Sequence, residues 1–249
     1  MYGARSILEY FYTEDQTLFY DFAILSYLSL CRNRNASGYW SNQTISSWLL
    51  TDYQIKNSYF DTRFNVDAGI FLLEIYQHFK IPYALTMSEK IGNILLVMMQ
   101  NKKAYFTDNG GLLLQDYDIS YQSKVKTHTS LNHLLNESSF FLLLYKTTKK
   151  EKYLFAQHQL ILGIMATEDQ WKDKKTGDLF YCMHPDYSFG RKDYVTLTYH
   201  DLLRFNRLLG TITGLENQSI NRLGSFKENY LIKQGVVKNK KFNLDKEME

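Results

Sequence analysis

The chain has 249 residues, 45% of them hydrophobic, which is enough for one large domain or two small ones with a substantial core. Its 29 basic and 26 acidic residues give a net charge of +3, a near-balance that offers no electrostatic case for nucleic acid binding, which usually needs a clearly basic face. No apolar run approaches the roughly 20 residues of a membrane-spanning helix, and the first residues lack the pattern of a signal peptide. We therefore expect no membrane span and no nucleic-acid partner, and a cytoplasmic protein as the sequence stands, or a secreted one if a leader was trimmed.

The first half of the chain alternates helical patterns with one long polar loop. Apolar residues at helical spacing predict a buried helix over residues 16–32. Residues 33–62 are rich in Asn, Ser, Gly and aromatic residues, which predicts a long loop with one short helix at 43–50. A loop of this length inside a compact domain is often functional. Two further helices are expected over residues 64–79 and 83–100, separated by a proline that breaks the helical pattern.

The second half continues the alternation of helices and loops. The expected elements are, in chain order, a turn-rich break around Gly110-Gly111, an extended or irregular segment over 112–126, a helix over 129–146 that begins at Thr129 or Ser130, a helix over 153–167, a polar loop over 171–193, and a helix over 196–209 closed by Gly210. Periodicity is lost after residue 225, so residues 226–249 are expected to form a flexible tail.

The recurring order of helix, short turn, helix and longer loop is typical of stacked helical hairpins. No run of residues alternates convincingly enough to predict a strand that competes with this pattern. A bundle, a solenoid and a partial (α/α) toroid are the all-α folds that fit it. Neither a linker nor a fixed sequence period divides the chain, so we expect a single domain over residues 1–225. A homodimer remains open.

The common catalytic motifs are absent. There is no P-loop, no G-x-G-x-x-G after a strand, no H-E-x-x-H and no G-x-S-x-G. Cys182 and His184 supply only two of the three or four ligands that zinc needs, so we expect neither a metal nor an organic cofactor. The two cysteines, Cys31 and Cys182, are expected to be free thiols. A glycosidase pair of carboxylates stays open, with candidates identified by location alone: Glu137, Asp169 and Asp178.

The tyrosine content is unusual, with 20 tyrosines in the chain. Tyrosine combines an apolar ring with a polar tip and suits surfaces that bind sugars, although a skewed genome composition explains such a count equally well. Three segments of the second half combine tyrosine with polar or charged residues. They are GGLLLQDY at 110–117, GDLFYCMH at 177–184 and RKDYVTLTYHDLL at 191–203.

In their order and spacing, these segments resemble the C-terminal catalytic domain of D-glucuronyl C5-epimerases, an (α/α) toroid family. Members show a Gly-Gly followed by polar or acidic residues and a Tyr, then L-N-G-F, Y-D-L-R-H and R-W-D-Y-H-T-T-H motifs. The corresponding residues are Gly110-Gly111 with Gln115, Asp116 and Tyr117, then 134–145, then Phe180 to His184, and then Arg191, Asp193, Tyr194 and Thr196. The resemblance implies an all-α fold in which helical hairpins form a partial (α/α) toroid.

The resemblance also implies a carbohydrate-active protein, an isomerase that acts on or binds an acidic sugar or polysaccharide. C5 epimerisation needs an acid or base on each face of the sugar, and the catalytic roles fall to Tyr117 and Tyr194, one on each side. Tyr181 would substitute for a family tyrosine, and Arg191 would lower tyrosine pKa values and stabilise the enediolate. Substrate-binding roles are implied for Asp116, Asn136, His184, Asp193 and Tyr199.

Two departures keep other functions open. Phe180 and Met183 stand where the family has a tyrosine and an arginine, which favours a non-catalytic relative that binds glycan, or a structural protein that keeps only the fold. Each tyrosine named above also has an ordinary packing explanation. The enzymatic interpretation requires Tyr117, Tyr181, Tyr194 and Arg191 to converge on one cleft.

Overall fold

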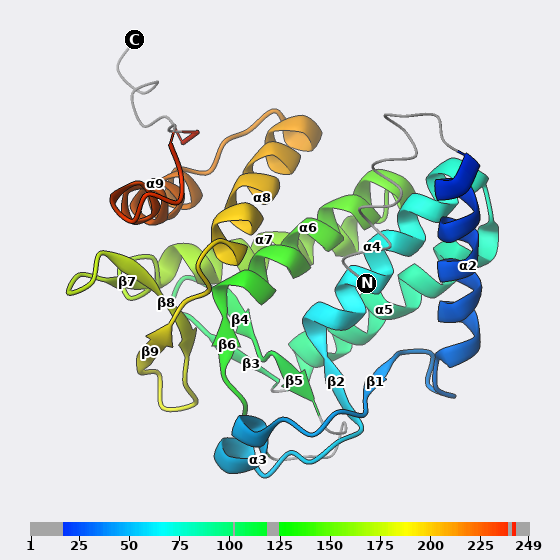
Figure 1. Cartoon of the computed structure of the whole chain (residues 1–249), viewed down its shortest axis with the longest axis horizontal. Coiled ribbons are helices and arrows are strands. Elements are labelled where there is room, and N and C mark those ends of the chain that lie inside the picture. Colours follow the sequence, from blue (N-terminus) through cyan, green and yellow to red (C-terminus); the bar gives the residue numbers. More distant parts are fainter. Residues whose placement is uncertain (1–16, 102, 119–124, 239–240, 243–249) are drawn as a thin grey trace.

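Helices make up most of the fold (Figure 1), and the computed structural model describes residues 17–101, 103–118, 125–238 and 241–242. The helices in the described part are α2 (Thr17–Asn33), α3 (Ser47–Tyr53), α4 (Thr62–Phe79), α5 (Pro82–Gln100), α6 (Leu131–Thr148), α7 (Glu151–Ala166), α8 (Leu197–Thr213) and α9 (Gln218–Lys233). The expected helices over 16–32, 64–79, 83–100, 129–146, 153–167 and 196–209 are all present, and the short helix expected at 43–50 lies a few residues later as α3.

The long helices form antiparallel hairpins side by side. Helix α4 packs on α5, α6 on α7 and α8 on α9, while α6 lies between α4 and α8 and so joins the three hairpins. Helix α2 packs on the outer side of this row against α4, so that α2 and α9 stand at opposite ends of the molecule in Figure 1. Large buried side chains, including Phe140, Phe141, Tyr153 and Phe205, fill the space between the hairpins.

Short turns close each hairpin, and local conformation explains where the helices end. Lys80 after α4 and Lys149 after α6 take left-handed backbone angles, with φ of 55° and 57°, and Gly214 after α8 has φ of 71°. Such a residue ends a helix because its N–H turns back to a carbonyl of the last turn. Pro82 occupies the first position of α5, where its missing N–H has no helical partner to lose.

The long loops between hairpins carry short strands, and these gather at one end of the helices (Figure 1). Every pairing among the described residues is antiparallel. One sheet contains β1 (Ser41–Asn42), β2 (Tyr59–Asp61) and β5 (Tyr117–Asp118), a second pairs β3 (Ala104–Phe106) with β4 (Leu112–Leu114), and a third contains β6 (Thr129–Ser130), β8 (Asp178–Met183), β7 (Lys172–Asp173) and β9 (Phe189–Lys192). The prediction of a plain polar loop over 171–193 is therefore wrong. Strands of two to six residues are too short for alternation to show in the sequence.

Two boundaries near the C-terminus also differ from the sequence prediction. Helix α8 continues through Gly210 to Thr213, because packing against α6 and α9 outweighs the weak helix propensity of one glycine. Helix α9 begins after the Asn217 cap, whose side chain accepts the Ile220 N–H, and runs to Lys233. The expected tail over 226–249 therefore starts too early, while its residues 239–240 and 243–249 lie outside the described part, as do residues 1–16 and 119–124.

Gly111 and Gly163 allow β4 and α7 to pack closely, a structural role that involves no catalytic group. Strand β4 crosses α7 so closely that a Cβ on Gly163 would lie 2.2 Å from the Leu112 carbonyl oxygen, and one on Gly111 would lie 2.2 Å from the Gly163 nitrogen. Both obstacles are backbone atoms, which cannot rotate away. The contact of β4 with α7 therefore depends on both glycines.

We expect Gly163→Ala to lower the free energy of unfolding by about 1–3 kcal/mol or more, because β4 must move off α7 to admit the methyl group. Urea unfolding measures the loss. Gly177→Ala is the comparison variant, since a Cβ there meets no atom within 4 Å and adds only the strain of a positive φ. Equal stability of Gly163→Ala and the wild type would show that β4 does not pack this tightly.

Candidate functional site

The candidate site lies at the end of the helices where the strand-bearing loops gather. Helices α4 and α6 both begin there, directly after β2 and β6. Helix α3, from the long loop of the first half, is held to this end by a small core of Leu49, Tyr53, Ile55, Tyr59 and Tyr117. The functional side chains thus come from loops far apart in sequence, positioned by rigid helices beneath them.

An aromatic cluster surrounds the fully buried imidazole of His128. The ring centroids nearest to it are those of Trp48 at 4.9 Å, Tyr117 at 5.4 Å, and Tyr53 and Tyr181 at 5.6 Å each. Tyr194 extends the cluster outward, edge-on to Tyr181 at 5.5 Å, and is 52% exposed while Tyr181 is 9% exposed. We call Trp48, Tyr53, Tyr117, Tyr181 and Tyr194 the aromatic cluster. It runs from the interior to the surface.

Arg191 adds a cation to this cluster. Its guanidinium lies 4.8 Å from the centre of the Trp48 ring and forms an ion pair with Asp52, which lies in the same helix as Trp48. Arg191 also has a left-handed backbone with φ of 64°, a conformation that costs energy for a residue with a side chain and that often occurs at functional sites. Tyr117, Tyr181, Tyr194 and Arg191 therefore lie in one network of ring contacts. Their convergence on one cleft stays a prediction.

A surface groove of about 690 Å³ opens beside the cluster. Tyr53 forms part of its wall, and the polar and charged groups around it are Asp52, Gln54, Lys126, His184, Asp186 and Ser188. His184, predicted to bind substrate, is thus at this groove, with its Nε2 3.8 Å from the Cys182 sulfur. Burial raises the pKa of Cys182 to about 12, so this thiol stays protonated and is no nucleophile at neutral pH.

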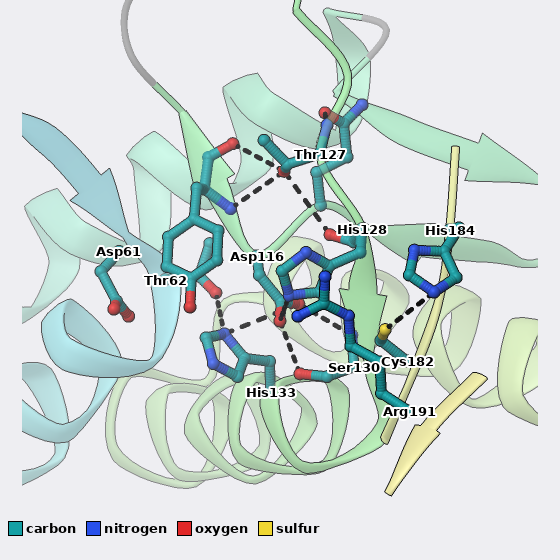
Figure 2. Close-up of polar contacts among 12 residues, drawn as sticks. Asp61, Thr62, Asp116, Thr127, His128, Ser130, His133, Cys182, His184 and Arg191 are labelled. Carbon is teal, nitrogen blue, oxygen red and sulfur yellow. Dashed lines mark hydrogen bonds and ion pairs between the residues drawn. The ribbon is translucent and has the colours of Figure 1, made fainter. Parts of the chain in front are cut away.

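Asp116 is completely buried, and Figure 2 shows it among His128, Ser130 and His133. One carboxylate oxygen accepts the Ser130 N–H at 2.8 Å, and the other accepts the Ser130 hydroxyl at 2.6 Å and lies 3.1 Å from His128 Nε2. Ser130 occupies the N-cap position of α6, but its hydroxyl donates a hydrogen bond to Asp116 and does not cap the helix. Burial alone would raise the pKa of Asp116, but the imidazoles of His133 and His128 and the Ser130 hydroxyl bring it below its usual value.

Asp116 and Tyr53 lie on opposite sides of the His128 imidazole. Nε2 is 3.1 Å from an Asp116 carboxylate oxygen, and Nδ1 is 3.1 Å from the Tyr53 hydroxyl. A carboxylate only accepts hydrogen bonds, so a proton on Nε2 faces Asp116 and leaves Nδ1 to accept from Tyr53. Tyr53 also lines the groove. An acid that orients an imidazole, which in turn accepts from a hydroxyl, is an arrangement that activates hydroxyls for proton transfer.

A second set of titratable groups lies on the other side of Asp116, toward α4 (Figure 2). Thr62 Oγ1 is 2.8 Å from His133 Nδ1, and burial lowers the pKa of His133 to about 4, so this imidazole is neutral at pH 7. Burial raises the pKa of Asp61 to about 7, with Asp116 adding to the shift. Burial likewise raises the pKa of Glu137 well above its usual value. Asp61 is the carboxyl group best matched to proton transfer near neutral pH.

The raised pKa of Asp61 predicts a pH-dependent stability. A carboxyl group whose pKa is higher in the folded state than its usual 3.8 favours folding below about pH 4 and loses that contribution as pH rises through 7. Asp61→Asn removes this titration but keeps an acceptor for the Phe64 N–H that caps α4. We expect the difference in unfolding free energy, wild type minus variant, to fall by at most about 4 kcal/mol between pH 4 and pH 7.5. Urea unfolding at a series of pH values measures it, and a difference independent of pH would contradict the shift.

Tyr117 and Tyr181 do not have the lowered pKa values that the resemblance implied. Burial raises the pKa of both tyrosines, and the nearby Asp116 carboxylate raises each further. Their neighbours are carboxylates and other tyrosines, whereas Arg191 stacks on Trp48 and pairs with Asp52. Both hydroxyls therefore remain protonated at neutral pH, and they are suited to donate a proton or hydrogen bond rather than to act as tyrosinate bases.

Three residues predicted to bind substrate lie apart from the aromatic cluster. Asp193 is buried and pairs with Lys227 at 2.8 Å, Tyr199 is buried and donates its hydroxyl hydrogen to Glu228 at 2.7 Å, and Asn136 donates its amide to Asp67 at 2.9 Å. These contacts join α8 and the loop before it to α9, and α6 to α4. These polar groups contribute to packing between elements, and a role of the three residues in substrate binding stays a prediction.

The positions that depart from the family motif are structural. Met183 is 1% exposed and belongs to the core, so no arginine function is retained there. Phe180 points to the other side of β8 from Tyr181, since successive strand side chains face opposite ways. Tyr181 is the residue of this strand that reaches the cluster, one position later than the motif.

Sequence reasoning missed Trp48, Tyr53 and Asp61 and did not assign a role to His128 or His133. All three come from the polar loop predicted over residues 33–62, whose unusual length was the available signal. The spacing of His128, Ser130 and His133 around a helix start is ordinary in itself. Only the tertiary structure shows that both histidines lie next to Asp116, at 3.1 Å for His128 and 3.7 Å for His133.

In the described part of the chain, no group of three or more His, Cys, Asp or Glu side chains is arranged to hold a metal ion. Within the same residues, none of the helices is both long enough and apolar enough to cross a membrane.

Comparison with known proteins identifies the fold. No family model matches the sequence, and neither does any curated protein. Among solved structures, the chain is similar to the cellobiose 2-epimerase from Spirochaeta thermophila DSM 6192, with a TM-score of 0.67 and 15% identity over 93% of this chain and 58% of that one. A D-mannose isomerase gives a TM-score of 0.63 and 10% identity over 92% of this chain and 58% of that one.

A third similar structure is the glycoside hydrolase family 76 mannosidase Bt3792 from Bacteroides thetaiotaomicron VPI-5482, with a TM-score of 0.52 and 15% identity over 71% of this chain and 45% of that one. The chain thus spans between about half and three fifths of the length of these structures. The similar proteins are (α/α) toroids, and this confirms the predicted fold class, an all-α arrangement of hairpins in a partial (α/α) toroid.

Proposed function

We propose that this chain acts on a sugar by proton transfer, with an acidic sugar or polysaccharide of the uronate type as its substrate. The observation that carries the proposal is the convergence of Tyr117, Tyr181, Tyr194 and Arg191 around a buried acid–base chain. Aromatic rings suit the apolar faces of a sugar ring, and the guanidinium suits its carboxylate. The similar solved structures include a sugar epimerase and a sugar isomerase, which favours this chemistry only by analogy of fold.

The residues divide into a proton acceptor and proton donors. The acceptor is the pair formed by Tyr53 and His128. Burial raises the pKa of Tyr53 as it does those of Tyr117 and Tyr181, so Tyr53 acts as a neutral phenol and not as a tyrosinate. Its hydroxyl proton moves to His128 as its oxygen takes the proton from C5 of the uronate, while Asp116 balances the imidazolium charge. The electron pair of the broken C–H bond passes to the substrate carboxylate, where Arg191 stabilises the developing enediolate. Tyr181 or Tyr117 then returns a proton to C5 from the other face, since both hydroxyls hold their protons at neutral pH. The tyrosinate left behind takes a proton from solvent and His128 releases its extra proton to solvent, which restores the starting state.

Solvent exchange tests this function. A polymer containing glucuronate is incubated with the protein in D2O, and deuterium at C5 is measured by NMR. We expect incorporation with the wild type and a loss of it with Tyr53→Phe, which removes the hydroxyl proposed to take the proton from C5. Absence of exchange with the wild type on polymers of glucuronate, mannuronate and galacturonate would refute the proposal.

A non-catalytic glycan-binding protein is the second candidate, favoured by the core position of Met183 and by the raised pKa values of the cluster tyrosines. It predicts measurable binding of the same polymers by calorimetry, dependent on Trp48 and Tyr194, with no exchange at C5.

A further inference from the structure

A second groove, separate from the aromatic cluster, runs along one face of α8. It has a volume of about 510 Å³, and its polar lining consists of His200, Arg204, Arg207, Thr211 and Lys241. The four residues from α8 are spaced by four, three and four positions and so share one face of the helix. Helix α8 is the last member of the row formed by α4, α6 and α8, and the groove lies on a face that no other described helix covers.

The lining of this groove is basic and contains no carboxylate. Arg204 lies 3.5 Å from Asp201, but that carboxylate is already bound by two guanidinium nitrogens of Arg63, at 2.5 and 3.1 Å. In a chain with 29 basic and 26 acidic residues, such a concentration of one sign is local rather than general.

Lys241 is positioned at the groove by a specific anchor. Its backbone N–H donates to Glu228 at 2.6 Å, and the next residue, Phe242, donates to the same carboxylate at 3.3 Å and inserts its ring against Gly224. A side chain at Gly224 would overlap that ring, with its Cβ 2.3 Å from the nearest ring atom. Burial lowers the pKa of His200, the Asp201 carboxylate opposes this shift, and the charges of Arg204 and Lys241 add to it, which agrees with cations from both segments lying near His200.

The shape of the groove selects the kind of anion. From His200 to Thr211 the helix rises about 16 Å, which exceeds the size of a single small anion and suits an extended ligand with several charges. Arginine is the side chain best suited to bidentate contacts with carboxylate or sulfate groups. Leu203 and Leu208 lie between the cations and offer apolar contact, which the faces of sugar rings can use.

We propose that the α8 groove binds an acidic polysaccharide strand, as a contact for the polymer away from the sugar that reacts. The basic lining of the groove supports the binding of a polyanion. The choice of a polysaccharide among polyanions rests on the proposed function. Arg204 and Arg207 make the main contacts, and Lys241 closes one side. Shorter uronates that occupy only the aromatic cluster do not reach this groove.

Calorimetric titration with polyglucuronate tests the inference. We expect the double variant Arg204→Gln/Arg207→Gln to bind the polymer at least about tenfold more weakly than the wild type, and to show a smaller dependence of affinity on salt. Lys174→Gln/Lys175→Gln is the matched control, because it removes the same charge from the exposed turn between β7 and β8. Circular dichroism confirms that both variants fold.

Each outcome separates this inference from the proposed function. The groove is supported as a polymer site if the arginine variant binds the polymer more weakly than the wild type. The variant should still bind the methyl glycoside of glucuronate with wild-type affinity and exchange its C5 proton at the wild-type rate. The same loss of binding in a protein without exchange activity keeps the groove and refutes the catalytic proposal. Unchanged polymer affinity in the arginine variant overturns the inference. So does an equal effect of the variant on polyglutamate and single-stranded DNA of matched charge, because the groove would then recognise charge alone.

Discussion

Replacing Tyr53 by phenylalanine is expected to lower the rate of deuterium incorporation at C5 of a uronate by about 10²- to 10⁴-fold, with little change in KM. The substitution removes only the hydroxyl that bonds to His128 Nδ1. The ring that stacks on His128, at an interplanar angle of 28°, is retained. The substrate therefore still meets the same aromatic surface, but the proton from C5 has no path to His128 and Asp116.

Two measurements distinguish this role from a structural one. Tyr153→Phe removes the hydroxyl of another buried tyrosine, which contacts Glu89 at 3.3 Å, and should leave exchange unchanged. The 15N resonance of His128 Nδ1 should also move when the Tyr53 hydroxyl is removed, whether or not a substrate has been found. If Tyr53→Phe exchanges at the wild-type rate, Tyr53 is not the proton acceptor.

The second large effect is expected at Lys227, whose side chain is fully buried between α9, β8 and the loop before α8. Its ammonium group lies 2.6 Å from Asp178, 2.8 Å from Asp193 and 2.9 Å from the Tyr194 carbonyl oxygen. Lys227→Met leaves two buried carboxylates without their cation. We expect a loss of about 3–5 kcal/mol in the free energy of unfolding, measured by urea denaturation.

The carboxylates themselves provide the control for this effect. Burial raises the pKa of Asp193 to about 6 even with the lysine present. Lys227→Met combined with Asp178→Asn and Asp193→Asn removes the unpaired charges and should recover part of the lost stability. A loss below about 1 kcal/mol in the single variant would mean that water reaches these groups. Because Lys227 also holds the Tyr194 backbone, the single variant should weaken glycan binding at the outer edge of the cluster.

The sequence by itself determined the helical architecture. Apolar spacing located the long helices to within a few residues, and Pro82 marked the turn between α4 and α5, because helix periodicity and proline geometry are local properties. The motif order around Tyr117, Tyr181, Tyr194 and Arg191 also identified residues that meet in space. The short strands and the continuation of α8 past Gly210 escaped prediction, since packing partners distant in sequence stabilise them.

Only the tertiary structure decided which polar residues form the site and in which protonation state. His128 and Asp116 are twelve positions apart, and Tyr53 is further still, yet both Asp116 and Tyr53 lie 3.1 Å from ring nitrogens of His128. The residue types of Asp193, Tyr199 and Asn136 are also common in sugar-binding sites. In this fold, however, their polar groups contact Lys227, Glu228 and Asp67 on neighbouring helices. Burial and neighbouring charge set these pKa values, and both depend on what the folded chain places around a side chain, which its position in the sequence does not reveal.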